Sequence, residues 1–119
     1  MKLLIRLNIF LLCSLLFAQS HAAKNNNENT NLRVISIYQI EDNSKSGFDF
    51  FTTAKIHKCG GKPSNRYRSY SDHKDVANRK FQLVLNALNY NHSVNVKTLG
   101  CEDRAMLVDY IGISLSRSK

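Results

Sequence analysis

The stretch from Asp75 to Lys97 is the one place in the chain where a helical pattern of apolar residues gives way to a strand pattern. The apolar residues first recur at spacings of three and four, which gathers them on one face of an α-helix. They are Ala77, Phe81, Val84, Leu85 and Leu88. Val94 and Val96 then alternate with polar residues, which is the period of a half-buried strand. We therefore expect a helix, capped by Asp72 or Asp75, that leads into a strand.

Four further segments carry strand patterns, and they are residues 33–40, 48–57, 66–71 and 105–115. The first is rich in β-branched residues. The second alternates so that one face carries Phe48, Phe50, Thr52, Ala54 and Ile56. Turn-forming residues separate the segments, and residues 58–65 contain the only proline and two adjacent glycines. Residues 23–31 are polar and have no apolar period, which predicts a loose arm.

This order of elements is strand, strand, short strand, helix, strand, strand. It is the order of an OB-fold, a five-stranded β-barrel whose helix lies between the third and fourth strands. The sequence therefore predicts a mostly β domain with one helix. A cystatin-like or other α+β sheet is the alternative, but a helix inserted this late in the chain suits it less well.

The N-terminal residues have the pattern of a secretory signal peptide. Lys2 and Arg6 form a basic start, residues 7–18 are mostly apolar, and Ser20 and Ala22 place small residues where signal peptidase prefers them. A transmembrane helix needs roughly 20 apolar residues, so this run is too short to span a membrane. We expect residues 1–22 to be removed during export through the periplasm, which leaves residues 23–119 as one secreted domain.

The mature chain is basic. Removing Lys2 and Arg6 from the 17 basic residues leaves 15 against nine acidic residues, a net charge of +6. A positive surface favours anionic partners such as nucleic acid, lipid head groups or sialylated glycans, and charge alone does not choose among them. It can also serve solubility only.

The cysteines indicate one disulfide. Cys13 lies in the leader, so the mature chain keeps Cys59 and Cys101, and in an oxidising compartment these two are expected to pair. They have no CxxC spacing, and His57, His73 and His92 are scattered along the chain. We therefore expect no metal or other cofactor.

Two functions that act on nucleic acid stay open as alternatives. Residues 66–71 (RYRSYS) alternate Arg and Tyr, a pattern suited to bases stacking on rings, but we favour an edge strand whose tyrosines cover the core. Three histidines and many lysines could serve a small basic ribonuclease that uses paired histidines. No histidine lies in a motif, and secretion argues against a nucleic-acid partner. We expect a protein without catalysis.

Four segments together resemble a known family. VISIYQI, FDFFTTAKI, FQLVLNALNYNHSVNVK and LVDYIGIS are similar in spacing to the receptor-binding B subunits of AB5 toxins, namely those of subtilase cytotoxin and typhoid toxin. The similarity spans nearly the whole mature chain in short segments with gaps between them. It implies an OB-fold, a homopentameric ring, binding of host cell-surface glycans and a separate enzymatic A subunit.

The resemblance also gives a role to a polar stripe on the expected helix. In such rings the helices line the central pore, where a neutral polar surface faces water or the A subunit. The stripe consists of Asn78, Gln82, Asn86 and Asn89. Plain solvent exposure of an Asn-rich sequence is the alternative. Leu83 and Ala87 extend the apolar surface of the helix beyond the face that packs on the barrel, which favours association with another chain.

The glycan-binding residues follow from the same resemblance. Asn31 stands where the family has a serine that holds sialic acid, so the glycan type is open. Polar groups near the end of the second strand correspond to Thr53, Lys55 and His57, and Lys55 would offer its charge to the sialic acid carboxylate. Tyr38 could add a ring, although its alternation with apolar residues favours core packing. A cysteine of the family's second strand is a threonine here, so the disulfide is drawn differently.

Overall fold

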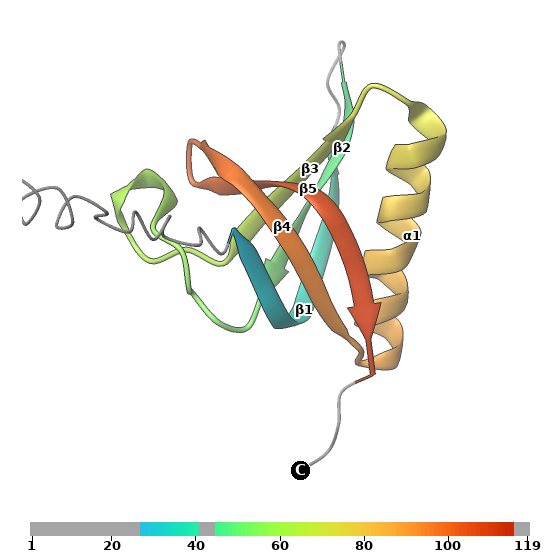
Figure 1. Cartoon of the computed structure of the whole chain (residues 1–119), viewed down its shortest axis with the longest axis horizontal. Coiled ribbons are helices and arrows are strands. Elements are labelled where there is room, and N and C mark those ends of the chain that lie inside the picture. The colour runs from blue at the N-terminus through green and yellow to red at the C-terminus, as the bar shows by residue number, and fades with distance from the viewer. Residues whose placement is uncertain (1–26, 41–44, 116–119) are drawn as a thin grey trace, which may run out of the picture.

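The computed structural model of the protein describes residues 27–40 and 45–115. These residues form five strands, one α-helix and a short 3-10 helix, whose arrangement can be followed in Figure 1. They are β1 (Glu28–Ile40), β2 (Ser46–Thr52), η1 (Cys59–Gly61), β3 (Arg66–Ser71), α1 (Lys74–Tyr90), β4 (Ser93–Glu102) and β5 (Ala105–Ser114). The expected signal peptide, residues 1–22, lies outside the described residues. Within the described residues, no helix is long and apolar enough to cross a membrane.

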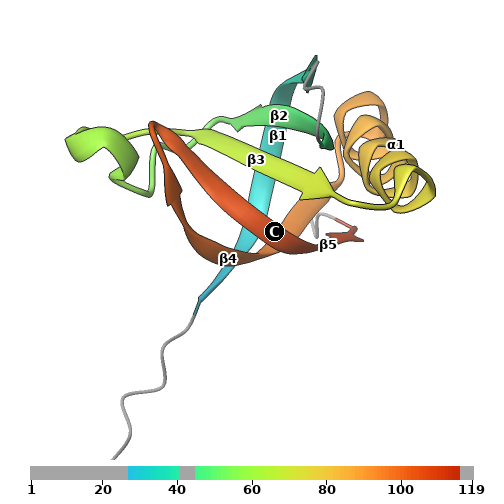
Figure 2. The same ribbon diagram turned by 90° about the horizontal axis from the view of Figure 1, so that it is seen from above.

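The strands form a closed barrel in the order β1-β2-β3-β5-β4. Neighbouring strands are antiparallel, except that β3 and β5 run parallel. The helix α1 lies at one end of the barrel, and the loop that carries η1 lies at the other end (Figures 1 and 2). The predicted OB-fold, with its helix between the third and fourth strands, is confirmed.

The core lies between the inner faces of the strands and one face of α1. Its buried members are Leu32, Val34, Phe48, Phe50, Tyr67, Val84, Ala87, Val94, Val96, Val108 and Ile111. The rings of Phe50 and Tyr67 stack at 5.2 Å between centroids, and Phe48 meets Phe81 of the helix edge-on at 5.5 Å. Because aromatic side chains bury large apolar areas, this ring cluster joins β2 and β3 to each other and to α1.

Two details of the predicted helix are wrong. Its N-cap is His73, and neither Asp72 nor Asp75 caps it; Asp75 lies inside the first turn, where a carboxylate is favoured by the helix dipole. Ala87 is only 1% exposed and belongs to the core, so it adds nothing to an exposed apolar flank. Leu83 is half-buried.

The strand β1 begins earlier than its sequence predicts. Residues 28–31 were expected in a loose arm, but Glu28 pairs with Lys97 and Asn29 with Val96 of β4. The register shifts between Asn29 and Leu32, where Asn31 has a left-handed backbone conformation with a φ of 57°. Asparagine tolerates this conformation better than most residues. The shift lets one strand pair with both β2 and β4, which closes the barrel.

The strand β2 ends earlier than predicted, at Thr52 and not at His57. Side chains cap its end: Thr52 Oγ1 donates to the carbonyl of Ala54 at 3.0 Å, and Asn65 Nδ2 donates to the carbonyl of Thr52 at 2.6 Å. Pairing with β3 stops at Phe51 and Arg66. The chain then turns away from the sheet, although its alternating pattern continues.

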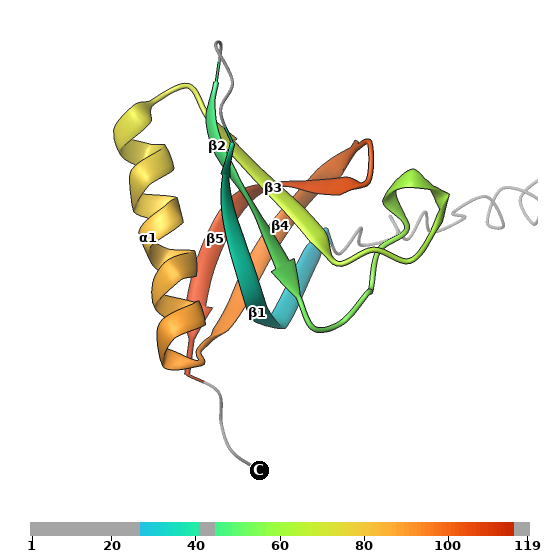
Figure 3. The ribbon, with the colours of Figure 1, turned by 180° about the vertical axis from the view of Figure 1, so that it is seen from behind.

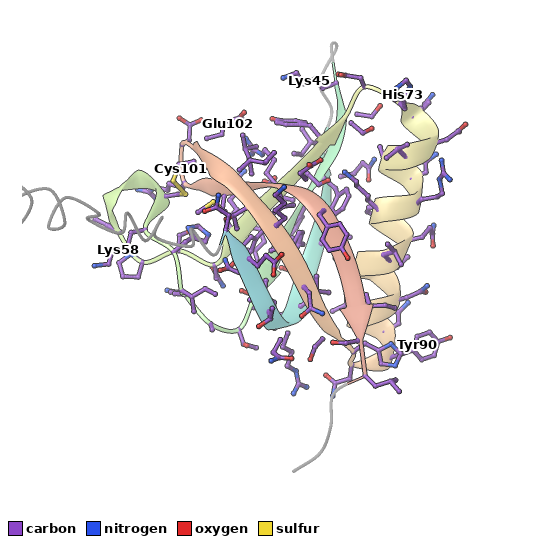
Figure 4. The ribbon with its side chains drawn as sticks, viewed as in Figure 1. Lys45, Lys58, His73, Tyr90, Cys101 and Glu102 are labelled. Atoms are coloured by element: carbon purple, nitrogen blue, oxygen red, sulfur yellow. A yellow bond between two sulfur atoms is a disulfide. The ribbon has the colours of Figure 1, made fainter. Side chains whose placement is uncertain are left out.

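The predicted disulfide between Cys59 and Cys101 is confirmed, with 5.3 Å between the Cα atoms. It ties the loop between β2 and β3 to the end of β4 across 42 residues of sequence. Figure 4 shows Cys101 beside this loop, on which Lys58 also lies. The loop of residues 53–65 is therefore fastened to the barrel at its midpoint.

Candidate functional site

The outer face of β1, β2 and β3 carries a hollow of about 580 Å³. Figure 3 shows these three strands side by side. We call it the aromatic hollow, and the lining residues that matter below are Tyr38, Asp49, Phe51, Asn65, Arg66 and Arg68. Asp49, Phe51, Arg66 and Arg68 point outward because their sequence neighbours Phe48, Phe50 and Tyr67 point into the core.

Two aromatic rings give the hollow its apolar surface. Tyr38 is 58% exposed, and its ring meets that of Phe51 edge-on at 5.7 Å. The expectation that Tyr38 packs in the core is wrong, because the register of β1 shifts between Val34 and Ser36. Beyond this bulge Ile37 packs against the core, so Tyr38 faces outward.

A carboxylate between two arginines forms the polar wall of the hollow. Asp49 is only 4% exposed, and it accepts hydrogen bonds from Arg66 Nε and Arg68 Nε, both at 2.7 Å, and from Arg68 Nη2 at 3.0 Å. Arg68 Nη1 donates to Glu102 Oε1 at 2.8 Å, and the hydroxyl of Tyr70 donates to the same oxygen at 2.8 Å. We call this chain of contacts the Asp49 network. It fixes both guanidinium groups on the barrel surface.

The pKa shifts of Arg68, Tyr70 and Glu102 keep the charge states of these three groups fixed near neutral pH. The hydrogen bonds from Arg68 and Tyr70 lower the pKa of Glu102, and the hydrogen bond to Asp49 raises the pKa of Arg68. Burial, followed by the hydrogen bond to Glu102, raises the pKa of Tyr70. These shifts move each group away from neutrality. The network is therefore suited to binding through fixed charges, and not to exchanging protons with a substrate.

A second hollow, of about 290 Å³, adjoins the first and shares Phe51, Asn65 and Arg66 with it. We call it the cationic hollow, because its lining includes Lys55, Lys62, Arg66 and Arg104. Its walls come from the loop of residues 53–65 and from the turn between β4 and β5. Ser64 Oγ joins these walls by donating to the carbonyl of Arg104 at 2.9 Å.

His57 holds this loop from inside. It is 7% exposed, its Nε2 lies 2.8 Å from the carbonyl of Arg66, and its Nδ1 accepts from the backbone N–H of Cys59 at 3.3 Å. These partners require a neutral ring that donates from Nε2 and accepts at Nδ1. Burial lowers the pKa of His57, and the bond to the Arg66 carbonyl acts less strongly in the opposite direction.

The four residues expected to bind glycan do not share one strand face. Thr53, Lys55 and His57 lie beyond the end of β2, and the buried ring of His57 is engaged inside the loop. Thr53 N–H donates to the carbonyl of Arg33 at 3.0 Å, and Asn31 N–H donates to Asn95 Oδ1 at 2.9 Å. Lys55 alone lines one of the two hollows.

Sequence reasoning named Tyr38 as a possible ring but missed the other residues of the aromatic hollow. One signal was present: Asp49 lies between two core phenylalanines, and Arg66 and Arg68 flank a core tyrosine, so all three must point outward. The missing information was the pairing of the strands, because Asp49 lies opposite Arg68 only when β2 and β3 are in register.

The alternating Arg and Tyr residues of β3 do not form a row of stacking rings. Tyr67 is fully buried in the core, and Arg66 and Arg68 bind Asp49. The strand is not an edge strand, because β2 and β5 flank it in the barrel. Of the two interpretations, stacking of bases and covering of the core, the second is therefore correct for Tyr67.

The histidines are too far apart to act as a catalytic pair. His73 precedes α1 and His92 follows it, so a helix of 17 residues separates them, as Figure 4 shows for His73 and Tyr90. Such a helix is roughly 25 Å long. His57 lies in the loop at the other end of the barrel. In the described part of the chain, no group of three or more His, Cys, Asp or Glu side chains could hold a metal ion.

The polar stripe of α1 faces outward. Its four members, Asn78, Gln82, Asn86 and Asn89, are all exposed. Three of them line a shallow groove together with Arg79 and Leu83. A role in lining a pore stays a prediction.

Comparison with known proteins found no matching family model, no matching curated protein and no matching solved structure. The function of the two hollows is therefore argued from their own side chains.

We expect Asp49→Ala to destabilise the protein by about 3 kcal/mol, because it leaves Arg66 and Arg68 without their shared buried partner. Urea unfolding followed by circular dichroism measures the loss. Asp109→Ala, which removes an exposed carboxylate from β5, is the matched control and should change stability by less than about 0.5 kcal/mol. Equal effects of the two substitutions would contradict a structural role of the network.

His57 predicts a pH dependence of stability. Its folded pKa is below the ordinary value of about 6.5, so between these two values the unfolded chain binds more protons. The stabilising contribution is therefore complete above about pH 6.5 and is lost as the pH falls through the folded pKa. Free energies of unfolding from urea titrations at about pH 7.5 and 5.5 measure this loss.

His57→Gln should reduce the difference in stability between the two pH values, because glutamine does not titrate. His73→Gln, at the exposed N-cap, should leave it unchanged. If His57→Gln and the wild type lose the same free energy on acidification, the assignment to His57 is wrong.

Proposed function

We propose that this chain is the glycan-binding B subunit of a secreted bacterial toxin. The observation that supports this most is the aromatic hollow, where two rings lie beside fixed guanidinium and amide groups. Sugar rings present apolar C–H faces together with hydroxyl groups. A site that combines an exposed aromatic surface with a few oriented polar groups matches both parts of such a ligand.

The place of the hollow in the fold agrees with this proposal. In OB-folds, the face that includes the second and third strands is the one that binds oligosaccharides and oligonucleotides. Tyr38 offers an exposed ring, Arg66 is held by Asp49, and Asn65 is close enough to β2 to donate to its last carbonyl. The guanidinium groups of Arg66 and Arg68 and the amide of Asn65 would select the orientation of the sugar hydroxyls.

Binding without catalysis fits the chemistry of these groups. Asp49 is saturated by two arginines, and Glu102 is held as an anion by Arg68 and Tyr70. A glycosidase needs one carboxylic acid that keeps its proton and one free carboxylate. The Asp49 network offers neither, which supports a lectin over a hydrolase.

A single open hollow of this kind should bind a sugar only in about the millimolar range, and a ring of subunits would raise the avidity. The proposal of five subunits in the ring, and of an A subunit as a further partner, comes from the resemblance to AB5 toxin B subunits. Exposed apolar residues on β4 and β5 offer area for subunit contact, and they include Leu99, Tyr110 and Ile113. Asn31 and Lys55 stay in the proposal as contacts at the margins of the bound glycan.

Tyr38→Ala should weaken binding on a multivalent glycan array by about tenfold, because it removes the exposed ring against which the sugar packs. Tyr38→Phe keeps the ring and should bind nearly as well as wild type. Tyr90→Ala removes another exposed tyrosine, at the end of α1 and outside both hollows, and is the matched control.

The same array separates the two possible positions of the glycan. If Asn31→Ala abolishes binding while Tyr38→Ala does not, the glycan lies at the start of β1 and not in the aromatic hollow. If the wild type binds no glycan on a broad array, the proposed function is wrong.

The assembly is tested separately. Light scattering at micromolar concentration should give the mass of five mature chains, and Tyr110→Asp should reduce it by placing a charge on the exposed apolar surface of β5. Tyr110→Phe, which keeps the exposed ring and adds no charge, is the control and should keep the wild-type mass. A monomeric wild-type mass would contradict the proposed ring.

A further inference from the structure

We propose that the cationic hollow binds a sulfate or phosphate ester carried by the glycan whose ring occupies the aromatic hollow. This inference rests on the proposed function for the glycan, but the anion site itself rests on the residues of the cationic hollow. It specifies the class of glycan as one that carries an ester oxyanion.

The charges of the hollow are the first argument. Four cationic side chains line it, from Lys55, Lys62, Arg66 and Arg104, and no acidic residue in the described chain lines it. Arg66 is neutralised by Asp49, but no described carboxylate forms an ion pair with Lys55, Lys62 or Arg104. Like charges gathered in one concave site repel one another, and an anion relieves this repulsion.

The rigid walls of the hollow are the second argument. The disulfide fixes Cys59 to β4, His57 fixes the loop to β3, and Ser64 fixes it to the carbonyl of Arg104. The loop also packs closely on Arg104, because a Cβ atom added to Gly60 would lie 2.8 Å from Arg104 Cγ. The cations are therefore carried on backbone that is ordered before a ligand arrives, which lowers the entropic cost of binding.

The third argument is the continuity of the two hollows. Phe51, Asn65 and Arg66 line both, so a sugar that packs against Tyr38 and Phe51 can place a substituent among the cations without leaving the surface. A carboxylate is satisfied by one bidentate arginine. Three unpaired cations around one small hollow suit a group with more acceptor oxygens, such as a sulfate or phosphate ester, and a phosphate monoester also carries more charge than a carboxylate.

A nucleic acid fits these residues less well, although it also carries phosphate. A strand of nucleotides needs a cationic groove with several exposed rings in sequence. Tyr67 is buried, and the cations surround one compact hollow of about 290 Å³. We therefore infer a glycan with an ester group, and single-stranded DNA serves as the contrasting ligand in the test.

The experiment compares matched pairs of immobilised glycans that differ only in one sulfate ester or in one phosphate ester. The wild type should bind the esterified member about tenfold more tightly. The double variant Lys62→Gln, Arg104→Gln should bind both members of each pair equally. The double variant Lys58→Gln, Lys97→Gln loses the same charge from exposed residues outside the hollow and should keep the wild-type ratio.

The two kinds of glycan pair identify the ester. A preference seen only in the sulfated pair indicates a sulfate ester, and one seen only in the phosphorylated pair indicates a phosphate ester. Equal binding of both members by the wild type overturns the inference and leaves the proposed function intact. Loss of the preference for the esterified glycan in both double variants also overturns the inference, because the preference would then depend on net charge and not on the hollow. Single-stranded DNA that binds as tightly as the esterified glycan overturns the ligand class.

A titration with sodium sulfate or sodium phosphate alone tests the anion site without any glycan. Relative to sodium chloride at equal ionic strength, either salt should raise the midpoint of thermal unfolding of the wild type by more than that of Lys62→Gln, Arg104→Gln; this excess shift measures the site, because stabilisation by salt exclusion is common to both proteins. If this shift is present and no glycan binds, the proposed function fails while the anion site stands. If it is absent, the anion site is wrong.

Discussion

The buried carboxylate of Asp49 is the constraint on which the outer face of the barrel depends. A carboxylate that is 4% exposed must be paired, since an unpaired charge in this position would cost several kcal/mol. Arg66 and Arg68 meet this requirement only if β2 and β3 keep their register, and their guanidinium groups are then held at Asp49. Their orientation sets one wall of the aromatic hollow, and Arg66 continues into the cationic hollow. A contact needed for folding thus also defines both proposed binding surfaces.

Barrel closure depends on a different property of the chain, the freedom of the β1 backbone to change partners. Asn31 adopts a left-handed conformation at one irregularity, and a second one lies between Val34 and Ser36. Each shift exchanges the inward and outward faces of the strand. The second shift turns Tyr38 outward and Ile37 toward the core, so the same irregularity that bends the strand provides the exposed ring of the proposed site.

The sequence predicted those features that depend on local periodicity. The helix, the order of the strands and the disulfide follow from residue spacing and cysteine count, and all three are confirmed. It failed where a distant partner decides the outcome. The end of β2 depends on Asn65, 13 residues away, and the start of β1 depends on pairing with β4. The hollow was missed for the same reason, because Asp49 and Arg68 meet only across strands. No periodicity rule contains these contacts.

The loop of residues 53–65 is held on the barrel by side-chain contacts and not by strand pairing. It leaves the sheet at Thr52, so it lacks the ladder of backbone hydrogen bonds that would order it. The disulfide, the neutral ring of His57 and the hydroxyl of Ser64 replace that ladder with three separate attachments. Three exposed cations, Lys55, Lys62 and Arg104, can then stay close together without the loop moving away to relieve their repulsion. A pocket of unpaired positive charge is stable only on such a restrained backbone, and this is the physical link between the packing at this end of the barrel and the anion that we propose it binds.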